Sequence, residues 1–548
     1  MLPDRSTLRW WLALGAGLVL LPCAYFFLVE PLLIAGHAQR GPVWLNHLLA
    51  SSKDLPIAAI LQAGRLYFSR SLFLFCAMLG AAAAWHSRQT VRKRWAVFLF
   101  EPDSPINLAV FRIALFAALF FVVSPNLTYL FASFPAELKK VPSLTGVFLR
   151  WLPFDPDVAT VAAYGLKAVC LLGMLGVASR MNALLAVVLG YYVLGIQQSF
   201  GKVNHIHHLI WFAMVLAASR CGDALSVDAW IGRRQESWSR RLAGPAASAV
   251  YGVPLRVVWL LFGVIYFFPG FWKFWNCGFA WGLPENMRLE MYAKWSYFGD
   301  WKPLLRIDQY PLLLILGGLG TMLFEMGFVF LIFQRPTRYL AAAAGMMFHT
   351  MTNLVMTISF WPLQVLYVCF LPWDRISKRL LPSSQQEPTA RAALPRDLVW
   401  TCAGLLAVNI ALGATHQEHA WPFACYPTFA SLMNPETTTA ELDRLDLQGH
   451  EQPMDMNVIF TSIPEPIWEA MIGKVLDNNV PPEKVQALGR VLDRILKDQP
   501  GPLRLYTVRK SILPDQTEKP PLEKKLVYEF PLQSDVKLGS VPASQTHR

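Results

Sequence analysis

The chain has 548 residues, of which 54% are hydrophobic and only 16% are charged, and its formal net charge is +12. This composition, with its repeated apolar runs, is typical of a multi-span membrane protein. The positive charge does not indicate nucleic-acid binding, because the arginine clusters lie in short loops between apolar runs. The first run lacks a small-x-small cleavage site and is long enough to span, so we expect a retained membrane helix.

Apolar runs of membrane length predict about eleven spans. We place them roughly at Trp10–Leu33, Leu72–Trp85, Asn107–Val123, Val158–Val177, Ala183–Ile196, His205–Ala218, Val257–Phe271, Tyr310–Phe333, Tyr339–Ile358, Pro362–Pro372 and Leu398–Ala414. The second, fifth, sixth and tenth runs are short, which favours tilted, extended or re-entrant segments at these places.

The basic residues orient these spans. With the amino end inside, arginine-rich loops such as Arg88–Arg94 and Arg233–Arg241 fall on the inner face, and the outer loops are poorer in basic residues. Lys139, Lys140 and Arg150 are the main exceptions. The pattern predicts a cytoplasmic amino terminus and an extracytoplasmic tail, which is periplasmic or lumenal. Of the two membranes, the bacterial inner membrane is the expectation, and the charge pattern does not distinguish it from the endoplasmic one.

The expected fold is an all-α polytopic membrane bundle of about eleven helices with a small α+β soluble C-terminal domain. We divide the chain into amino-terminal membrane helices (1–99), a membrane core (100–375), a linker with the last membrane helix (376–415) and an extracytoplasmic soluble tail (416–548). In the tail, residues 438–449 and 503–513 alternate as strands do. Residues 463–476 and 481–496 have helical periodicity with proline near the start.

The run VVWLLFGVIYFFPGFWKFW (Val257–Trp275) is the most informative stretch. It has no charge between Arg256 and Lys273, and aromatic residues surround that lysine on both sides. One interpretation is a snorkelling lysine that anchors the helix beside an aromatic belt. The other is a desolvated amine that burial keeps neutral, so that it can act as a base.

Other polar groups also interrupt apolar runs. Arg112, Glu325 and His349 each lie inside a predicted span, and Asn204 and His205 open another. Such groups are costly in a membrane and usually face a cavity or a partner. A structural interpretation is an Arg112–Glu325 pair with hydrogen-bonded histidines bracing the bundle. We expect no metal, because no acidic partner or second spaced histidine pair accompanies these residues.

The eight cysteines form no CxxC pair and have no zinc-site spacing. Most of them lie in predicted spans, where a buried thiol is the usual state. Cys277 and Cys425 differ, because the predicted topology places both on the outer face, where disulfides persist. A disulfide between these two is therefore a hypothesis.

Four motifs in order resemble the vitamin K-dependent γ-glutamyl carboxylase family and its bacterial relatives, the horizontally transferred transmembrane (HTTM) domain proteins. They are SPINLAVFRI (104–113), the Asn-His pair at 204–205 with CGDALSVDAW (221–230), YFFPGFWKF (266–274) and FHTMTNLVM (348–356). Together they cover roughly residues 100–375, the predicted membrane core. The sequence departs from the carboxylase pattern at Val203 and Trp272, and its tail is much shorter than the carboxylase lumenal domain.

The resemblance implies a reaction in which a vitamin K hydroquinone-like quinol is oxidised with O2, a glutamate γ-carbon loses a proton and CO2 adds. It implies that Lys273 is the catalytic base and that His205 assists it as a hydrogen-bond donor. Quinol or substrate binding would then fall to Arg112, Asn204, Glu325 and His349. The implied partners are the lipid membrane, a lipid-soluble quinol and a peptide or protein glutamate.

Two hypotheses follow from these observations. The first is a membrane oxidoreductase or carboxylase of this family that acts on a quinol at the outer face. The second is a non-enzymatic transporter or assembly scaffold that uses the same helix bundle. A transporter would carry polar groups along a path through both halves of the membrane, whereas these groups gather toward one side, which favours the enzyme.

Overall fold

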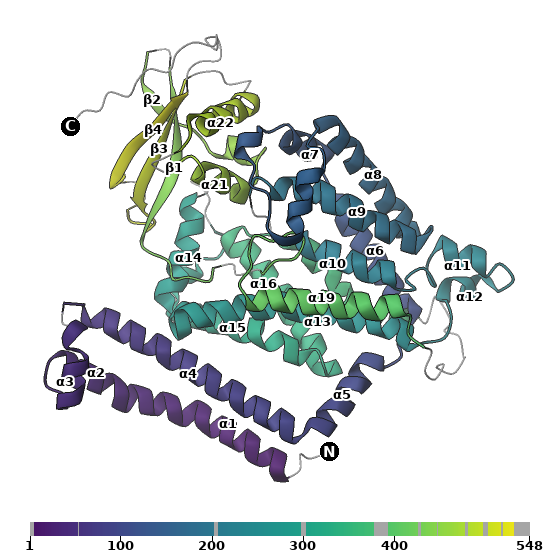
Figure 1. The fold of residues 1–548 in the computed structure, drawn as a ribbon, viewed down its shortest axis with the longest axis horizontal. Coiled ribbons are helices and arrows are strands. Elements are labelled where there is room, and N and C mark those ends of the chain that lie inside the picture. The colour runs from purple at the N-terminus through teal and green to yellow at the C-terminus, as the bar shows by residue number, and fades with distance from the viewer. Residues whose placement is uncertain are drawn as a thin grey trace.

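The computed structural model describes residues 5–52, 54–201, 206–297, 303–377, 393–425, 429–446, 448–476, 480–496, 502–516 and 519–530. The chain is mostly helical, with a small antiparallel sheet near the carboxyl end (Figure 1). Asn204 and His205 lie outside the described residues, as do most of the linker and the last eighteen residues.

Eight helices of the described chain are long and apolar enough to cross a membrane. They are Gly15–His37, Ile57–His86, Pro105–Val122, Pro156–Leu175, Ser179–Gln198, Ala249–Gly282, Pro311–Leu331 and Arg396–Ala414. Two shorter apolar helices cover His207–Ala218 and Trp361–Phe370. The protein is therefore a helical membrane protein, and the expected number of about eleven spans stays a prediction.

The first six helices run from the amino end to the start of the core. They are α1 (Arg5–Ala24), which continues through a π-helical segment (Tyr25–Val29) into α2 (Glu30–His37), then α3 (Val43–Leu48), α4 (Ile57–His86), α5 (Arg88–Phe100) and α6 (Pro105–Val122). Helix α4 begins fifteen residues before the predicted Leu72–Trp85 span. Its first half carries Arg65 and Arg70, whose charge kept this part of the helix out of the predicted span. Arg65 is paired with Glu30, and Arg70 donates to the Trp275 carbonyl.

The next helices form the bundle around the centre of the core. They are α7 (Pro125–Ala132), α8 (Pro156–Leu175), α9 (Ser179–Gln198), α10 (His207–Ala218), α11 (Val227–Gly232) and α12 (Trp238–Ala243). Side-chain caps define several of their starts: Ser104 begins α6, Asp155 begins α8 and Ser226 begins α11. Gly176, with φ of 71°, ends α8 in the left-handed conformation that favours glycine.

Helix α13 (Ala249–Cys277) passes through the middle of the bundle and is the most buried of the candidate spans. Ser248 caps its first turn, and its 29 residues make it about 43 Å long. Pro269 and Gly270 do not end the helix, and α13 continues past both to Cys277. The lysine therefore sits on regular helix, with its direction fixed.

The remaining elements return along α13 and lead to the tail. They are a 3-10 segment η6 (Gly278–Gly282), α14 (Pro284–Tyr297), α15 (Pro311–Leu331), α16 (Arg335–Met356), α17 (Trp361–Val365), η8 (Leu366–Phe370), α18 (Trp373–Ile376) and α19 (Arg396–Ala414). Helix α15 packs along α13 because two glycines of α13 remove side chains from the contact. A Cβ on Gly263 would lie 2.8 Å from Val329, and one on Gly270 would lie 2.7 Å from the Glu325 Cβ.

The tail forms a four-stranded antiparallel sheet in the order β2-β1-β3-β4 with helices on one side (Figure 1). The strands are β1 (Glu436–Leu445), β2 (Glu451–Pro453), β3 (Leu503–Ser511) and β4 (Glu523–Phe530), and the helices are α20 (Asn457–Phe460), α21 (Glu465–Gly473) and α22 (Pro482–Ile495). The small α+β tail expected from the sequence is thus confirmed. Strand β4 was not predicted, because EKKLVYEF carries four charges in eight residues.

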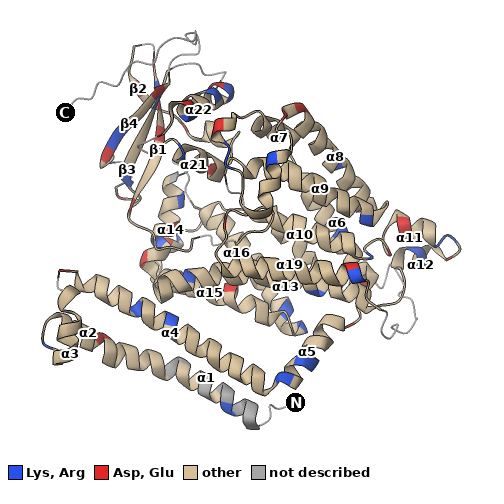
Figure 2. Cartoon of the chain, viewed as in Figure 1, with Lys and Arg blue, Asp and Glu red and all other residues tan. Residues whose placement is uncertain are grey.

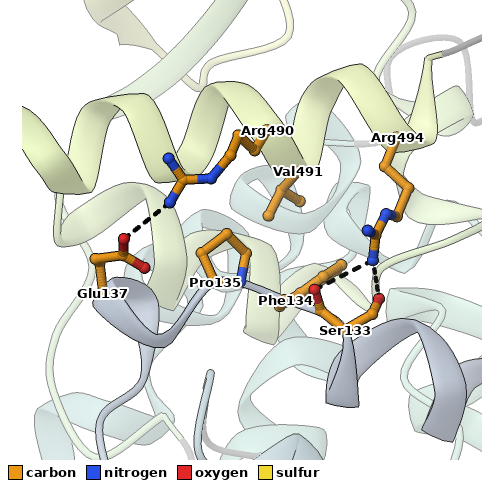
Figure 3. A pocket seen from close by; sticks show the side chains of 7 residues that line it. All are labelled: Ser133, Phe134, Pro135, Glu137, Arg490, Val491 and Arg494. Atoms are coloured by element: carbon orange, nitrogen blue, oxygen red, sulfur yellow. Dashed lines mark hydrogen bonds and ion pairs between the residues drawn. The ribbon is translucent and has the colours of Figure 1, made fainter. Parts of the chain in front are cut away.

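The tail is docked on the membrane core by specific contacts. Figure 3 shows Arg490 and Arg494 of α22 reaching to Glu137 and Ser133, which follow α7. These residues line a hollow of about 230 Å³. The Arg490–Glu137 ion pair is 2.9 Å long. Lys474, after α21, donates to the backbone carbonyls of Leu138 and Phe200 at 2.6 and 3.0 Å. The tail is therefore held against the core and not merely tethered to it.

The two ends of α13 face different surroundings. At its start, Tyr251 donates to Asp223 in the loop before α11, and Arg256 is paired with Glu101 and Asp103. Helix α5, which ends beside that pair, carries a run of basic residues (Figure 2). At the other end lie α14 and the tail sheet, opposite α11 and α12 (Figure 1). The arginine-rich loop and the tail thus occupy opposite ends of the bundle, as the charge pattern predicts.

Candidate functional site

Lys273 points into the protein. Its side chain is only 4% exposed, and its Nζ lies 2.6 Å from Oε1 of Glu325 on α15, whose side chain is 5% exposed. The same Nζ lies 4.8 Å from the ring centre of Trp281 in η6. This burial is against the snorkelling interpretation, in which the amine would reach the headgroups. Lys273 and Glu325 instead form a buried polar pair under an aromatic wall.

Local sequence explains why the two helices can bring these groups together. Gly270 lies one turn before Lys273 and leaves room for the Glu325 side chain against α13. A second close approach, between Gly282 of η6 and Gly318 of α15, holds the chain that carries Trp281 against the same helix. Phe274, Cys277, Trp281 and Met322 then form an apolar cluster around the lysine end. These glycines thus determine how closely α15 approaches α13, and so how deeply the Lys273–Glu325 pair is buried.

A second polar cluster lies two turns earlier on the same face of α13. Tyr266 Oη lies 2.5 Å from Nε2 of His349 on α16 and is also hydrogen-bonded to the Tyr367 hydroxyl of η8. Tyr266 and Lys273 are seven residues apart, which places both toward α15. Glu325 also interacts electrostatically with Tyr266. Glu325 therefore lies near enough to both Lys273 and Tyr266 to act on each of them electrostatically.

Glu290 on α14 is a further member of this region that the sequence analysis missed. Its side chain is 3% exposed, and neither carboxylate oxygen has a hydrogen-bond partner among the described residues. Burial raises the pKa of Glu290 to about 8, although the charges of Lys273 and Lys294 lower it. The segment PENMRLEMYAKW reads as a polar surface helix, and Glu290 with Lys294 reads as an ordinary surface pair. Nothing in the residue pattern of this segment indicates that Glu290 is buried.

Arg112 is not part of this cluster. Its guanidinium donates to the carbonyls of Cys221, Ala224 and Leu225, and more weakly to that of Met174. The structural interpretation of an Arg112–Glu325 pair is wrong, because Glu325 is paired with Lys273. Sequence shows that both groups are buried but not which helices face one another. Arg112 instead fixes the loop CGDALSVDAW to α6.

The expected disulfide is also not formed. Cys277 and Cys425 are not joined to each other in the described chain. The Cys277 Sγ instead lies 3.6 Å from the Ala430 carbonyl oxygen, within the apolar cluster at the end of α13. The carboxyl-side segment does come back over this end of α13, since Trp281 Nε1 donates to Phe429 O at 2.6 Å. The predicted topology correctly brings this segment to the end of α13, but it does not decide whether two cysteines there are bonded.

The donor set decides which chemistry the region suits. Among the described residues no group of three or more His, Cys, Asp or Glu side chains is arranged to hold a metal ion. Oε2 of Glu325 has no hydrogen-bond partner there and could accept one from a hydroxyl. A hydroxyl bound at that oxygen would lie beside the Lys273 amine and between aromatic walls. The region therefore offers one acceptor oxygen beside a buried amine.

Comparison with known proteins gives one match. A family model described as the HTTM domain matches residues 100–374, half of the chain. The matched region includes Lys273, Glu290, Glu325 and His349 and ends just before the linker. The chain has no match among curated proteins and none among solved structures.

Proposed function

Because the chain belongs to the HTTM domain family, we propose that it is a membrane enzyme that oxidises a quinol with O2, with Lys273 as the base. The observation that supports this proposal is the buried amine of Lys273, held 2.6 Å from Glu325 beneath an aromatic wall. A base for a lipid-soluble hydroxyl must lie at membrane depth and away from water. Lys273 lies in a candidate membrane-spanning segment, and its side chain is only 4% exposed.

The ion pair with Glu325 raises a proton problem that the mechanism must solve. An ammonium cannot accept a proton, so Lys273 must first lose one, and Glu325 is in direct contact to take it. The transfer turns the resting ion pair into a neutral amine beside a neutral carboxylic acid, which removes two desolvated charges from a buried site. Glu325 therefore both positions the lysine and stores the proton that frees its lone pair.

The other residues hold and orient the reacting molecule in this proposal. A quinol supplies two electrons and two protons for the reduction of O2. The Lys273 amine accepts a hydroxyl proton, and Oε2 of Glu325 accepts a hydrogen bond that aligns that hydroxyl. Tyr266, positioned by His349 and Tyr367, offers a phenol on the same face. The cluster of Phe274, Trp281 and Met322 limits water at the amine.

The proposal extends, by family relationship, to the use of the reaction. Oxidation would be coupled to proton removal from the γ-carbon of a peptide or protein glutamate, to which CO2 adds. The docked tail domain lies at the α14 end of the bundle (Figure 1), and α14 follows the end of α13 that carries Lys273. A peptide substrate would approach there, at the extracytoplasmic face of what we propose to be a bacterial inner membrane.

The direct test is quinol oxidation by the purified protein in lipid nanodiscs, followed on passage from anaerobic to aerobic buffer. We expect the wild type to consume quinol and O2 together, and Lys273→Ala to lose at least about a hundredfold in rate. Lys273→Arg should fail as well, because guanidinium stays protonated. Lys167→Ala is the matched control, since Lys167 is a span lysine that donates to the Phe120 carbonyl elsewhere. A wild-type protein inactive with several quinols would reject the proposal.

A structural scaffold is the second candidate, and one observation favours it. Lys273 is already neutralised by Glu325, as Arg256 is by Asp103 and Glu101, so all three pairs could simply brace helices. A bracing pair predicts that Lys273→Arg is tolerated and that Lys273→Ala costs stability. A catalytic pair predicts the opposite for rate, with the fold retained.

A further inference from the structure

Glu290 is a buried acid that the mechanism above does not use. It lies on α14 and interacts electrostatically with two groups of α13, Lys273 and Cys277. It is 3% exposed, and both of its oxygens are without a hydrogen-bond partner in the described chain. Buried carboxylates with a purely structural role are normally held by donors, because an unsatisfied carboxylate is costly. The position therefore calls for another explanation.

A polar connection leads outward from Glu290. Lys294 lies one turn further along α14, on the same face as Glu290. Its Nζ is 2.6 Å from Oε1 of Glu465, at the start of α21 in the tail. The side chains of Lys294 and Glu465 are 22% and 16% exposed, against 4% for Lys273. Lys273 and Glu290 are thus both buried, and the charged groups become partly accessible to water at Lys294 and Glu465.

We propose that Glu290 carries protons between the Lys273–Glu325 pair and the surface at Lys294 and Glu465, an assignment that rests on the proposed function. In the outward direction a Lys273 N–H bond breaks as an O–H bond forms on Glu290, directly or through a water molecule. Glu290 finally releases the proton to water beside Lys294. No electrons move, and each transfer restores the preceding group.

Two features suit Glu290 to this role. Lys273 and Lys294 both favour the ionised form of Glu290, so a positive charge on either lysine stabilises the carboxylate. The pKa of Glu290, which burial raises to about 8, also lies near neutral pH, and a group with such a pKa can both take up and release protons readily. A leucine at the same place would have been less costly to bury.

The first test needs no turnover. Infrared spectra recorded between about pH 6 and about pH 9 should show a protonated carboxyl band that disappears on titration and is missing in Glu290→Gln. Lys273→Met removes a nearby positive charge and should raise the midpoint of that band by about half to one pH unit. Lys167→Met, the matched control, should leave it unchanged. No band, or a midpoint indifferent to Lys273, would overturn the assignment.

The second test uses turnover and separates this assignment from the proposed function. Glu290→Gln should slow quinol oxidation by about tenfold or more, and a small buffer such as imidazole should restore part of the rate. Glu285→Gln, at an exposed position of the same helix, should turn over normally. Full activity of Glu290→Gln in an active protein overturns the relay alone. An inactive wild type refutes the proposed function, and the infrared midpoint then decides whether Glu290 and Lys273 share a proton.

Discussion

The partners of single buried residues decide how this protein is interpreted. Sequence analysis identified Lys273, Glu325, His349 and Arg112 as costly groups in apolar segments, and all four are buried. It did not identify who pairs with whom, since a hydropathy pattern contains no register between distant helices. It missed Glu290 because α14 also carries other charged residues at helical spacing, and such a pattern is typical of a helix face in water.

The raised pKa of Glu290 predicts a pH-dependent stability. Below about pH 4.5 the carboxyl is protonated in both the folded and the unfolded chain. Between there and about pH 8 the unfolded chain releases the proton while the folded chain keeps it, so folding loses roughly 3 to 5 kcal/mol as the pH rises. Glu290→Gln should therefore gain thermal stability over the wild type progressively across this window. A stability difference that does not change with pH would contradict the prediction.

Arg112 should be a structural residue. Arg112→Gln removes donors from the carbonyls of Cys221, Ala224 and Leu225 and should cost about 3 kcal/mol of stability. Arg180→Gln, which breaks an exposed pair with Asp397, should cost less than about 1 kcal/mol. Thermal unfolding in detergent measures both. Weakened quinol binding by an Arg112→Gln protein of normal stability would restore the substrate-binding role that the resemblance implies.

At the scale of elements, sequence periodicity placed the tail helices and strands β1 and β3 well. It was less successful at helix ends, as α4 and α13 show: both extend well beyond the apolar run because polar residues in them find partners. The close packing of α13 on α15 was not foreseeable, since it depends on which neighbour Gly263 and Gly270 meet.

Gly270 should therefore be critical to the site. In Gly270→Ala the new Cβ would lie 2.7 Å from the Glu325 Cβ, which must push α15 away and lengthen the contact between Lys273 and Glu325. Overpacking of this kind costs about 1 to 3 kcal/mol. Gly317→Ala is the control, because its Cβ would meet nothing within 4 Å, and it should be neutral or slightly stabilising. Equal melting temperatures for the two variants would show that the interface can yield without cost.

At the scale of the whole molecule, the fold agrees with the separation of the arginine-rich loop from the tail that the charge pattern predicts. The arginine-rich α11–α12 region and the tail lie at opposite ends of the bundle (Figure 1). Which end faces the cytoplasm follows only from the positive-inside rule. The family of the core was predictable because its motifs are local in sequence. The docking of the tail was not, because ion pairs such as Arg490–Glu137 join residues far apart in the chain.

Orientation can be measured with membrane-impermeant thiol reagents on intact cells, in a protein whose exposed Cys23 is replaced by serine. We expect Thr461→Cys, exposed in the tail, to be labelled from outside, and Ser237→Cys, exposed before α12, to be labelled only after lysis. The reverse pattern would put the Lys273 end of α13 at the cytoplasm and remove the extracytoplasmic site.

The central claim is that the Lys273 amine acts as a base, and chemical rescue measures that most directly. Lys273→Ala should be supplied with small primary amines of increasing basicity but similar size, and the rate of quinol oxidation recorded for each. The account predicts partial recovery, with a logarithmic rate that rises with the basicity of the free amine. Recovery that is absent, or that follows amine size and not basicity, would contradict it and leave Lys273 as a structural partner of Glu325.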